Sequence, residues 1–224
     1  MNIIMMGAQG TGKGTVAGIL KQGLNIPHIS TGEIFRKNIK EGTELGKIAT
    51  KYADEGKLVP DEVTNSMVKN RLNEADCVNG FILDGYPRNL AQAEELDKML
   101  EEKGSKIDMV VYLTTPTDEI ISRVMARREC PKCKEVYNMI LKRPIEGEIC
   151  DNCGTQLIRR VDDTEEKLKT RLDIFFAQTE PVIDFYKQKG IVREETVSVS
   201  INRMGVDVAK DIIEEVKGQE NDIN

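Results

Sequence analysis

The sequence lacks any hydrophobic run of the length that crosses a membrane. Its apolar stretches stay well below the roughly 18 consecutive apolar residues that indicate a transmembrane helix. The first apolar stretch, residues 3–6, leads straight into a glycine-rich loop, with neither the basic segment nor the small-residue cleavage site of a secretory signal. We therefore expect a cytoplasmic protein with no membrane partner.

An excess of positive charge is also missing. The 32 lysines and arginines are outnumbered by 38 aspartates and glutamates, which gives a formal net charge of −6. Sequence-independent binding of nucleic acid requires a basic surface, because it depends on the neutralisation of phosphates. The composition therefore argues against a nucleic-acid partner, and any basic site must be local.

Histidine and cysteine are scarce. The single histidine, His28, lies in a strand-like stretch with no acidic or thiol neighbour at ligand spacing, so we interpret it as a hydrogen-bonded structural residue. Five cysteines are present, and in a reducing compartment they favour metal binding over disulfides. Four of them form two pairs, and the fifth, Cys77, is expected to pack as a small apolar side chain.

The most informative stretch is residues 1–15, MNIIMMGAQGTGKGT, in which an apolar run breaks into a loop that ends in Lys-Gly-Thr. Its glycines can leave backbone N–H groups free to surround a phosphate; they are Gly7, Gly10, Gly12 and Gly14. Lys13 would supply charge to the outer phosphates, aided by the dipole of the next helix, and Thr15 would support Mg²⁺. The alternative is a glycine-rich turn with a solvated lysine, which fits poorly between a strand and a helix.

The rest of the chain alternates strands and helices, as in an α/β protein with a parallel sheet. Strands are expected at residues 26–30, 81–83, 109–113 and 192–199. Residues 30–62 predict two or three short helices, which form a compact insert. A long helix follows residue 163, with Asp163 and Glu166 spaced as a capping box and with a kink or restart at Pro181.

Asp84 closes the apolar strand 81–83, the position of a Walker B aspartate. If that strand neighbours the first one, its carboxylate lies beside the phosphate loop and suits holding the waters of Mg²⁺. Taken alone, Asp84 is better interpreted as an ordinary turn or capping residue, and it is the phosphate loop at residue 7 that favours the Mg²⁺ role. Gln92 has a structural alternative too, because its spacing from Asn89 is that of a capping box.

Two arginines, Arg123 and Arg127, lie four residues apart on a predicted helix over residues 117–127. Their spacing places them on one face, where like charges repel each other unless they share an anion. The alternative is a solvated basic face.

Two C-x₂-C pairs form the strongest metal signal: Cys130 with Cys133, and Cys150 with Cys153, with sixteen residues between the pairs. Four thiolates make a closed tetrahedral zinc site, which leaves no coordination position for catalysis. Residues 130–158 contain four basic and four acidic side chains, so the segment has no excess of basic charge for nucleic acid. We predict a structural zinc ion.

The stretches GAQGTGKGT, STGEIFR, DGYPRNLAQ, RVMARR and RRVDDTEEKLKTR, in this order, resemble the adenylate kinase family in its long form with a four-cysteine lid. The resemblance covers essentially the whole chain. It implies a P-loop nucleotide-kinase fold and reversible, Mg-dependent transfer, ATP + AMP = 2 ADP, by a monomer that maintains adenine nucleotide balance. The implied domains are a core (1–29, 60–125 and 164–224), a helical AMP-binding insert (30–59) and a zinc lid (126–163).

The resemblance also implies roles for matching residues. The catalytic ones are Lys13, Asp84, Arg88, Arg123, Arg127, Arg160 and Arg171. The ATP-binding ones are Gly10, Thr11, Gly12, Lys13, Gly14, Thr15, Arg127, Val136, Tyr137 and Arg203. The AMP-binding ones are Thr31, Arg36, Lys57, Leu58, Val59, Gly85, Tyr86, Pro87, Arg88, Gln92, Arg160 and Arg171. The four paired cysteines would hold zinc, and Mg²⁺ would enter with ATP.

The chain departs from the family pattern at four positions, where Gln9 replaces proline, Glu33 aspartate, Tyr86 phenylalanine and Asn138 histidine. None of these changes removes a charged phosphate ligand. Gln9 is expected to loosen the phosphate loop, because a proline would restrict the backbone. Glu33 leaves Asp84 as the better-supported holder of Mg²⁺ waters.

Two other functions stay open at this point. One is a kinase that acts on another nucleoside monophosphate or uses GTP as its donor. The other is a nucleotide-gated protein whose zinc segment docks nucleic acid. The balanced charge of that segment argues against the second.

Overall fold

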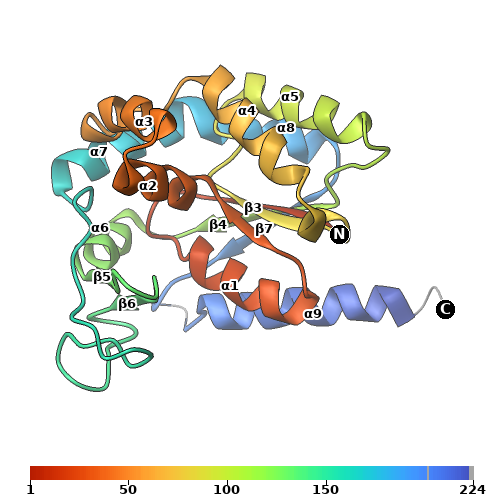
Figure 1. The fold of residues 1–224 in the computed structure, drawn as a ribbon. Coiled ribbons are helices and arrows are strands. Elements are labelled where there is room, and N and C mark those ends of the chain that lie inside the picture. Colours follow the sequence, from red (N-terminus) through yellow and green to blue (C-terminus); the bar gives the residue numbers. More distant parts are fainter. Residues whose placement is uncertain (201, 222–224) are drawn as a thin grey trace.

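The computed structural model describes residues 1–200 and 202–221, and its centre is a five-stranded sheet in the order β2-β3-β1-β4-β7 (Figure 1). All neighbouring strands run parallel. The strands are β1 (Asn2–Met6), β2 (His28–Ser30), β3 (Phe81–Asp84), β4 (Met109–Thr114) and β7 (Val192–Thr196). The predicted five-stranded parallel core is confirmed.

Helices cover both faces of this sheet (Figure 1). One face packs against α1 (Lys13–Leu24) and α9 (Gly205–Asn221), and the other against α4 (Asp61–Leu72), α5 (Leu90–Glu101) and α8 (Glu180–Gln188). Side chains of β1 alternate between the two, because successive side chains of a strand point to opposite faces. No helix of the described residues is long and apolar enough to cross a membrane.

The long helix predicted after residue 163 is interrupted. It consists of α7 (Glu165–Ile174), a π-helical segment η2 (Phe175–Thr179) and α8, which starts with Pro181 in its first turn. The predicted restart at Pro181 is therefore confirmed. The predicted capping box is wrong, because Thr164 caps α7 by accepting a hydrogen bond from the Lys167 N–H at 3.3 Å.

Two segments leave the sheet between its strands. The first is a helix pair, α2 (Thr31–Glu41) and α3 (Glu44–Asp54), which follows β2. The second, which we call the cysteine segment, runs over residues 127–158 after α6 (Thr117–Met125). It is built on the antiparallel pair β5 (Arg127–Glu129) and β6 (Val136–Asn138). Both approach the carboxyl ends of the parallel strands (Figure 1).

The last strand of the sheet ends earlier than predicted. β7 ends at Thr196 rather than at residue 199, because Ser198 forms an isolated bridge with Arg203 instead of continuing beside β4. The short helix η1 (Ala75–Cys77) precedes β3. Cys77 is buried there beside Arg71, whose Nη1 lies 3.0 Å from the sulfur. The prediction that it packs in the interior is confirmed.

The contact between α2 and α3 depends on Gly46, where a Cβ would lie 2.1 Å from the backbone oxygen of Asn38. We expect Gly46→Ala to lower the free energy of unfolding by about 1–3 kcal/mol, because overpacking forces the helices apart. Urea denaturation checks this. Gly218→Ala is the matched control, since a Cβ there meets nothing within 4 Å. Equal urea midpoints for the two variants would contradict the prediction.

Candidate active site

The phosphate-loop candidate follows β1, in the middle of the sheet. Gly7 and Gly12 have φ angles of 139° and 99°, in the region that favours glycine. A Cβ at Gly7 would lie 2.4 Å from the backbone oxygen of Leu113, so this position has no room for a side chain. α1 begins at Lys13 without a side-chain cap, which leaves its first backbone N–H groups available for an anion.

Lys13 turns back onto this loop. Its Nζ donates hydrogen bonds to the backbone oxygens of Gly7 at 2.7 Å and Ala8 at 2.8 Å. Burial lowers the pKa of Lys13 to about 8, against the opposing charge of Asp84 and with the added repulsion of Arg88. A bound phosphate would supply full negative charge in place of carbonyl dipoles, and it would therefore favour the charged form of Lys13.

Asp84 ends β3 and pairs in register with Met5 of β1, so the two strands are neighbours as the Walker B interpretation requires. Burial acts to raise the pKa of this carboxyl, but His28 and Lys13 together hold it below its ordinary value. Asp84 is therefore an ionised oxygen ligand beside the phosphate loop, which suits Mg²⁺.

His28 is the neighbour of Asp84 that the sequence did not reveal. Its Nε2 lies 3.5 Å from Oδ2 of Asp84, and among the described residues this buried nitrogen has no hydrogen-bond partner. The sequence shows no acidic neighbour of His28 at ligand spacing, because His28 and Asp84 are distant along the chain. They meet only through the parallel pairing of β2 with β3.

Basic side chains from separate parts of the chain converge above the phosphate loop. Burial lowers the pKa of Arg88, and the charge of Arg171 lowers it further. The pKa of Arg36 is lowered in the same way by burial and then by the charge of Arg160. Crowded guanidinium groups repel each other, so this cluster is suited to a multiply charged anion.

Four arginines of the predicted site also have carboxylate partners. The pairs are Arg123 with Glu119 at 2.7 Å, Arg127 with Asp163 at 2.8 Å, Arg160 with Glu129 at 2.5 Å, and Arg171 with Asp162 at 2.8 Å. Asp163 is fully buried and faces Arg127 with both oxygens. The sequence-based reasoning missed these acids, although the i,i+4 spacing of Glu119 and Arg123 and the adjacent Asp162 and Asp163 could have suggested them.

The candidate AMP contacts around β3 are held by the protein itself. The Thr31 hydroxyl and the Arg88 Nε both donate to the backbone oxygen of Gly85, each at 2.9 Å. The Gln92 Oε1 accepts from the Arg88 backbone N–H at 2.7 Å, and its Nε2 donates to Asp61 at 2.6 Å. The Gln92 amide therefore fixes the loop that carries Arg88.

A further support of this loop comes from the π-helical segment η2. The Thr179 hydroxyl donates to the backbone oxygen of Arg88 at 2.8 Å. A π-helical turn places an extra residue in the helix, and such turns are frequent at functional sites. Thr179 was not among the predicted site residues, because periodicity alone does not reveal a π-helical turn.

Other predicted site residues are held by contacts of their own. Tyr137 is buried inside the cysteine segment, next to Cys130 and Cys150. Arg203 pairs with Glu195 and Asp211, both at 2.8 Å. Tyr86 is buried beneath the β3 loop, where its hydroxyl donates to Asn65 at 2.8 Å. The predicted residues Lys57, Leu58 and Val59 lie in the connection from α3 to α4.

The four paired cysteines come together as predicted. Their sulfur atoms all lie within 4.8 Å of one another, and all four are free thiols. Tetrahedral zinc with four sulfur ligands needs sulfur atoms about 3.8 Å apart, from Zn–S distances of about 2.3 Å. The donor set therefore fits zinc.

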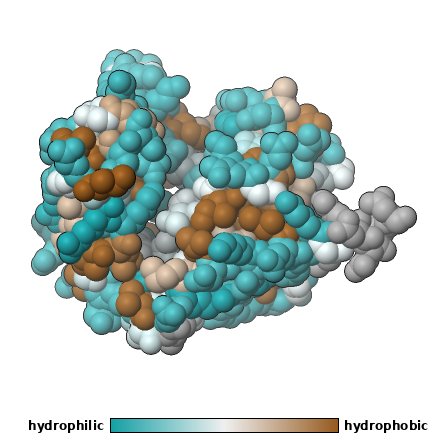
Figure 2. Space-filling view, turned by 90° about the horizontal axis from the view of Figure 1, so that it is seen from below, coloured by the Kyte–Doolittle hydropathy of each residue, from teal (hydrophilic) through white to brown (hydrophobic). Residues whose placement is uncertain are grey.

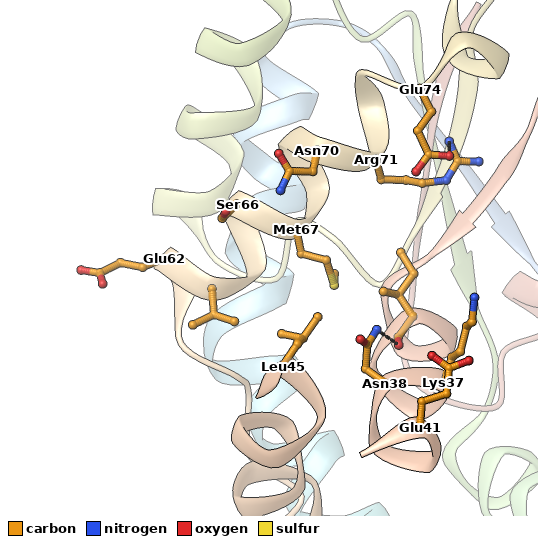
Figure 3. Close-up of a pocket in the computed structure, with 12 residues that line it drawn as sticks. Lys37, Asn38, Glu41, Leu45, Glu62, Ser66, Met67, Asn70, Arg71 and Glu74 are labelled. Atoms are coloured by element: carbon orange, nitrogen blue, oxygen red, sulfur yellow. Dashed lines mark hydrogen bonds and ion pairs between the residues drawn. The ribbon is translucent and has the colours of Figure 1, made fainter. Parts of the chain in front are cut away.

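A cavity of about 840 Å³ lies between the α2–α3 pair and α4 (Figure 3). Its apolar wall includes Ile34, Leu45 and Met67, and charged side chains such as Lys37 and Glu62 surround it. None of the predicted nucleotide ligands lines this cavity. It separates the α2–α3 pair from α4, and so leaves that pair room to shift against the rest of the molecule.

Comparisons with known proteins agree with this geometry. The sequence model of the family described as adenylate kinase matches residues 5–191. An adenylate kinase of Caldicellulosiruptor bescii is 50% identical over 192 residues, covering 86% of this chain and 89% of the relative. An adenylate kinase of Streptomyces griseus subsp. griseus is 45% identical over 223 residues, covering 98% of this chain and 99% of the relative.

A third relative, from Caldanaerobacter subterraneus subsp. tengcongensis, is also an adenylate kinase. It is 45% identical over 213 residues, covering 95% of this chain and 96% of its own. With a glycine-rich loop beside a partly buried aspartate, neighbouring arginines and relatives that match nearly end to end, the chain belongs to the adenylate kinase family.

Proposed function

We propose that this protein catalyses the reversible transfer ATP + AMP = 2 ADP through the basic cluster above the phosphate loop. The observation that carries the proposal is the set of cationic groups at the phosphate loop: Lys13 lies near Arg88 and Arg127, and Arg171 donates a hydrogen bond to Gln9 of the loop. Phosphoryl transfer has a loose, highly charged transition state, which needs positioning and positive charge more than a nucleophile.

The donor would lie on the phosphate loop. Backbone N–H groups at the start of α1 and the Lys13 ammonium would hold its outer phosphates. Mg²⁺, when bound with ATP, neutralises charge between the phosphates; Thr15 and waters on Asp84 would hold it. Arg123 would then exchange its carboxylate partner for phosphate oxygens, and Arg127, which Asp163 holds through Nε and Nη2, would offer Nη1 to the phosphates.

The acceptor would lie between the α2–α3 pair and the β3 loop. Arg88 and Arg36 would hold the monophosphate, with Thr31 and the 57–59 connection around the nucleoside. The loop that carries Arg88 is fixed on two sides, by Gln92 and by Thr179. A fixed loop helps catalysis, because it needs no rearrangement when AMP binds.

Water must be excluded, since it would otherwise accept the phosphoryl group. We propose that residues 30–59 and 126–163 close over the substrates and open to release products, while 1–29, 60–125 and 164–224 form the core. The cavity between α2–α3 and α4 gives the first insert room to move. The ion pair between Arg127 and Asp163 joins the two ends of the second insert.

We further propose that the cysteine segment is a structural zinc site and does not bind nucleic acid. Its basic side chains are neutralised by acids of the same segment, as in the pairs Lys142 with Glu135 and Arg128 with Glu148. A cytoplasmic location and a monomeric state stay predictions from the sequence. Hydrophobic patches on the face in Figure 2 are separated by hydrophilic side chains, which is in keeping with a monomer.

The function is tested by the conversion of AMP, UMP, CMP or GMP to its nucleoside diphosphate, with ATP or GTP as donor. We expect AMP with ATP to give the highest kcat/KM. A higher value with another monophosphate would reassign the acceptor site, and a higher value with GTP would reassign the donor. Only hydrolysis of ATP, without ADP formed from AMP, would overturn the proposal.

The pKa of Lys13 predicts a pH dependence. In the free enzyme this pKa is lowered to about 8, so the charged and active form is lost as pH rises above that value. Because kcat/KM reports the free enzyme, kcat/KM for ATP should fall above pH about 8. Lys13→Met should lower kcat by about 100-fold and abolish this inflection. Lys21→Met, on the exposed end of α1, is the control and should retain it.

Loss of the metal should loosen the cysteine segment without stopping the chemistry. Replacing Cys130 and Cys133 by serine should remove zinc, lower the thermal midpoint and leave kcat within about tenfold in the cold, because a closed four-thiolate site has no catalytic position. Emission spectroscopy and ADP-formation kinetics measure both. Cys77→Ser should keep one zinc ion per chain. A folded, metal-free variant that is inactive at every temperature would place zinc in the catalytic step.

A further inference from the structure

Gln9 has no place in the proposed mechanism, although it lies at the tip of the phosphate loop. It occupies the position at which the family pattern has proline. The sequence predicted that this change loosens the loop, because it restores freedom to the backbone. The structure places the Gln9 side chain, half-buried, between two ion pairs.

Both polar atoms of the Gln9 amide form hydrogen bonds. Its Oε1 accepts a hydrogen bond from Nη1 of Arg171 at 2.9 Å, and its Nε2 donates to Oδ1 of Asp163 at 3.1 Å. Arg171 is held from its other side by Asp162 at 2.8 Å. Asp163 is held by Arg127 through both carboxylate oxygens. One amide therefore joins two charged pairs to the phosphate loop.

The chemistry of the partners fixes the orientation of this amide. A guanidinium can only donate and an ionised carboxylate can only accept. The amide oxygen must therefore face Arg171, and the NH₂ group must face Asp163. Proline and aliphatic side chains offer neither atom, and a carboxylate offers the acceptor without the donor.

Arg171 and Asp163, the two partners of Gln9, both connect to arginines of the proposed active site. Arg171 belongs to α7 and is one of the arginines whose charge reaches Arg88. Asp163 stands at the end of the second insert and holds Arg127 at its beginning. A displacement of the Gln9 amide would shift both arginines relative to Lys13.

We propose that Gln9 is a positioning residue, whose amide holds Arg171 and the Arg127–Asp163 pair at fixed positions relative to the phosphate loop. It touches none of the reacting atoms. Hydrogen bonds to charged groups are stronger than those between neutral groups. A single amide can therefore hold the guanidinium of Arg171 directly and that of Arg127 through Asp163. The inference rests on the proposed function, and it concerns kcat rather than substrate affinity.

The test compares Gln9→Leu with Gln22→Leu, which makes the same chemical change at an exposed position of α1. With ATP and AMP as substrates, Gln9→Leu should lower kcat about tenfold, as for the loss of a hydrogen bond to a charged group. KM for both substrates should stay within about twofold, because Lys13, Arg36 and Arg88 do not depend on the Gln9 amide and still hold the phosphates. Thermal midpoints measure folding separately.

Two further variants separate positioning from loop stiffness. Gln9→Pro stiffens the backbone but lacks the amide, so its kcat should fall as in Gln9→Leu. In an Arg171→Lys background, Gln9→Leu should reduce kcat less than in the parent, because residues that act together are not additive. A loosened loop would give additive losses in the double variant and a recovered kcat in Gln9→Pro.

The outcomes distinguish this inference from the function on which it rests. A parent that forms ADP, with Gln9→Leu within twofold of Gln22→Leu in kcat, overturns the positioning role alone. Parental kcat in Gln9→Pro, or full additivity with Arg171→Lys, also overturns it. A parent that forms no ADP from ATP and AMP overturns the proposed function itself.

Discussion

Desolvation and repulsion of partly buried cationic side chains are the constraint on which the site depends. Burial disfavours the charged forms of Lys13, Arg36 and Arg88, and a neighbouring guanidinium adds to the penalty at each of them. The protein offsets this repulsion with acids: Asp84 faces Lys13, and carboxylates hold the arginines of α6, α7 and the second insert. Those acids, the parallel strands and the fixed β3 loop serve the same task of holding positive charge in place.

The sequence predicted the sheet, the phosphate loop and the cysteine cluster, because each is a local signal. A strand–loop–helix with glycines and a C-x₂-C pair can be read within a few residues. It did not predict the contacts that join distant segments. His28 meets Asp84 only through strand pairing, and Asp163 meets Arg127 across the whole cysteine segment. Asp163 was instead assigned to a helix cap, since its spacing from Glu166 favoured that local explanation.

Gln9 shows how one side chain can reverse the meaning of a substitution. If only the backbone is considered, replacing proline by glutamine gives the loop more conformational freedom. Considered with its neighbours, the same residue adds hydrogen bonds to Arg171 and Asp163. Sequence reasoning had no access to the second effect, because both partners lie more than a hundred residues away along the chain.

The carboxylate partners of the arginines have a consequence for anion selectivity. A small anion such as sulfate can reach one guanidinium at a time, and it must compete there with a carboxylate already in contact. A nucleotide carries several phosphates on one backbone, so each contact raises the effective concentration for the next. Affinity should therefore rise steeply with the number of linked phosphates. The ion pairs of the unliganded protein weaken the binding of free inorganic anions more than the binding of nucleotides.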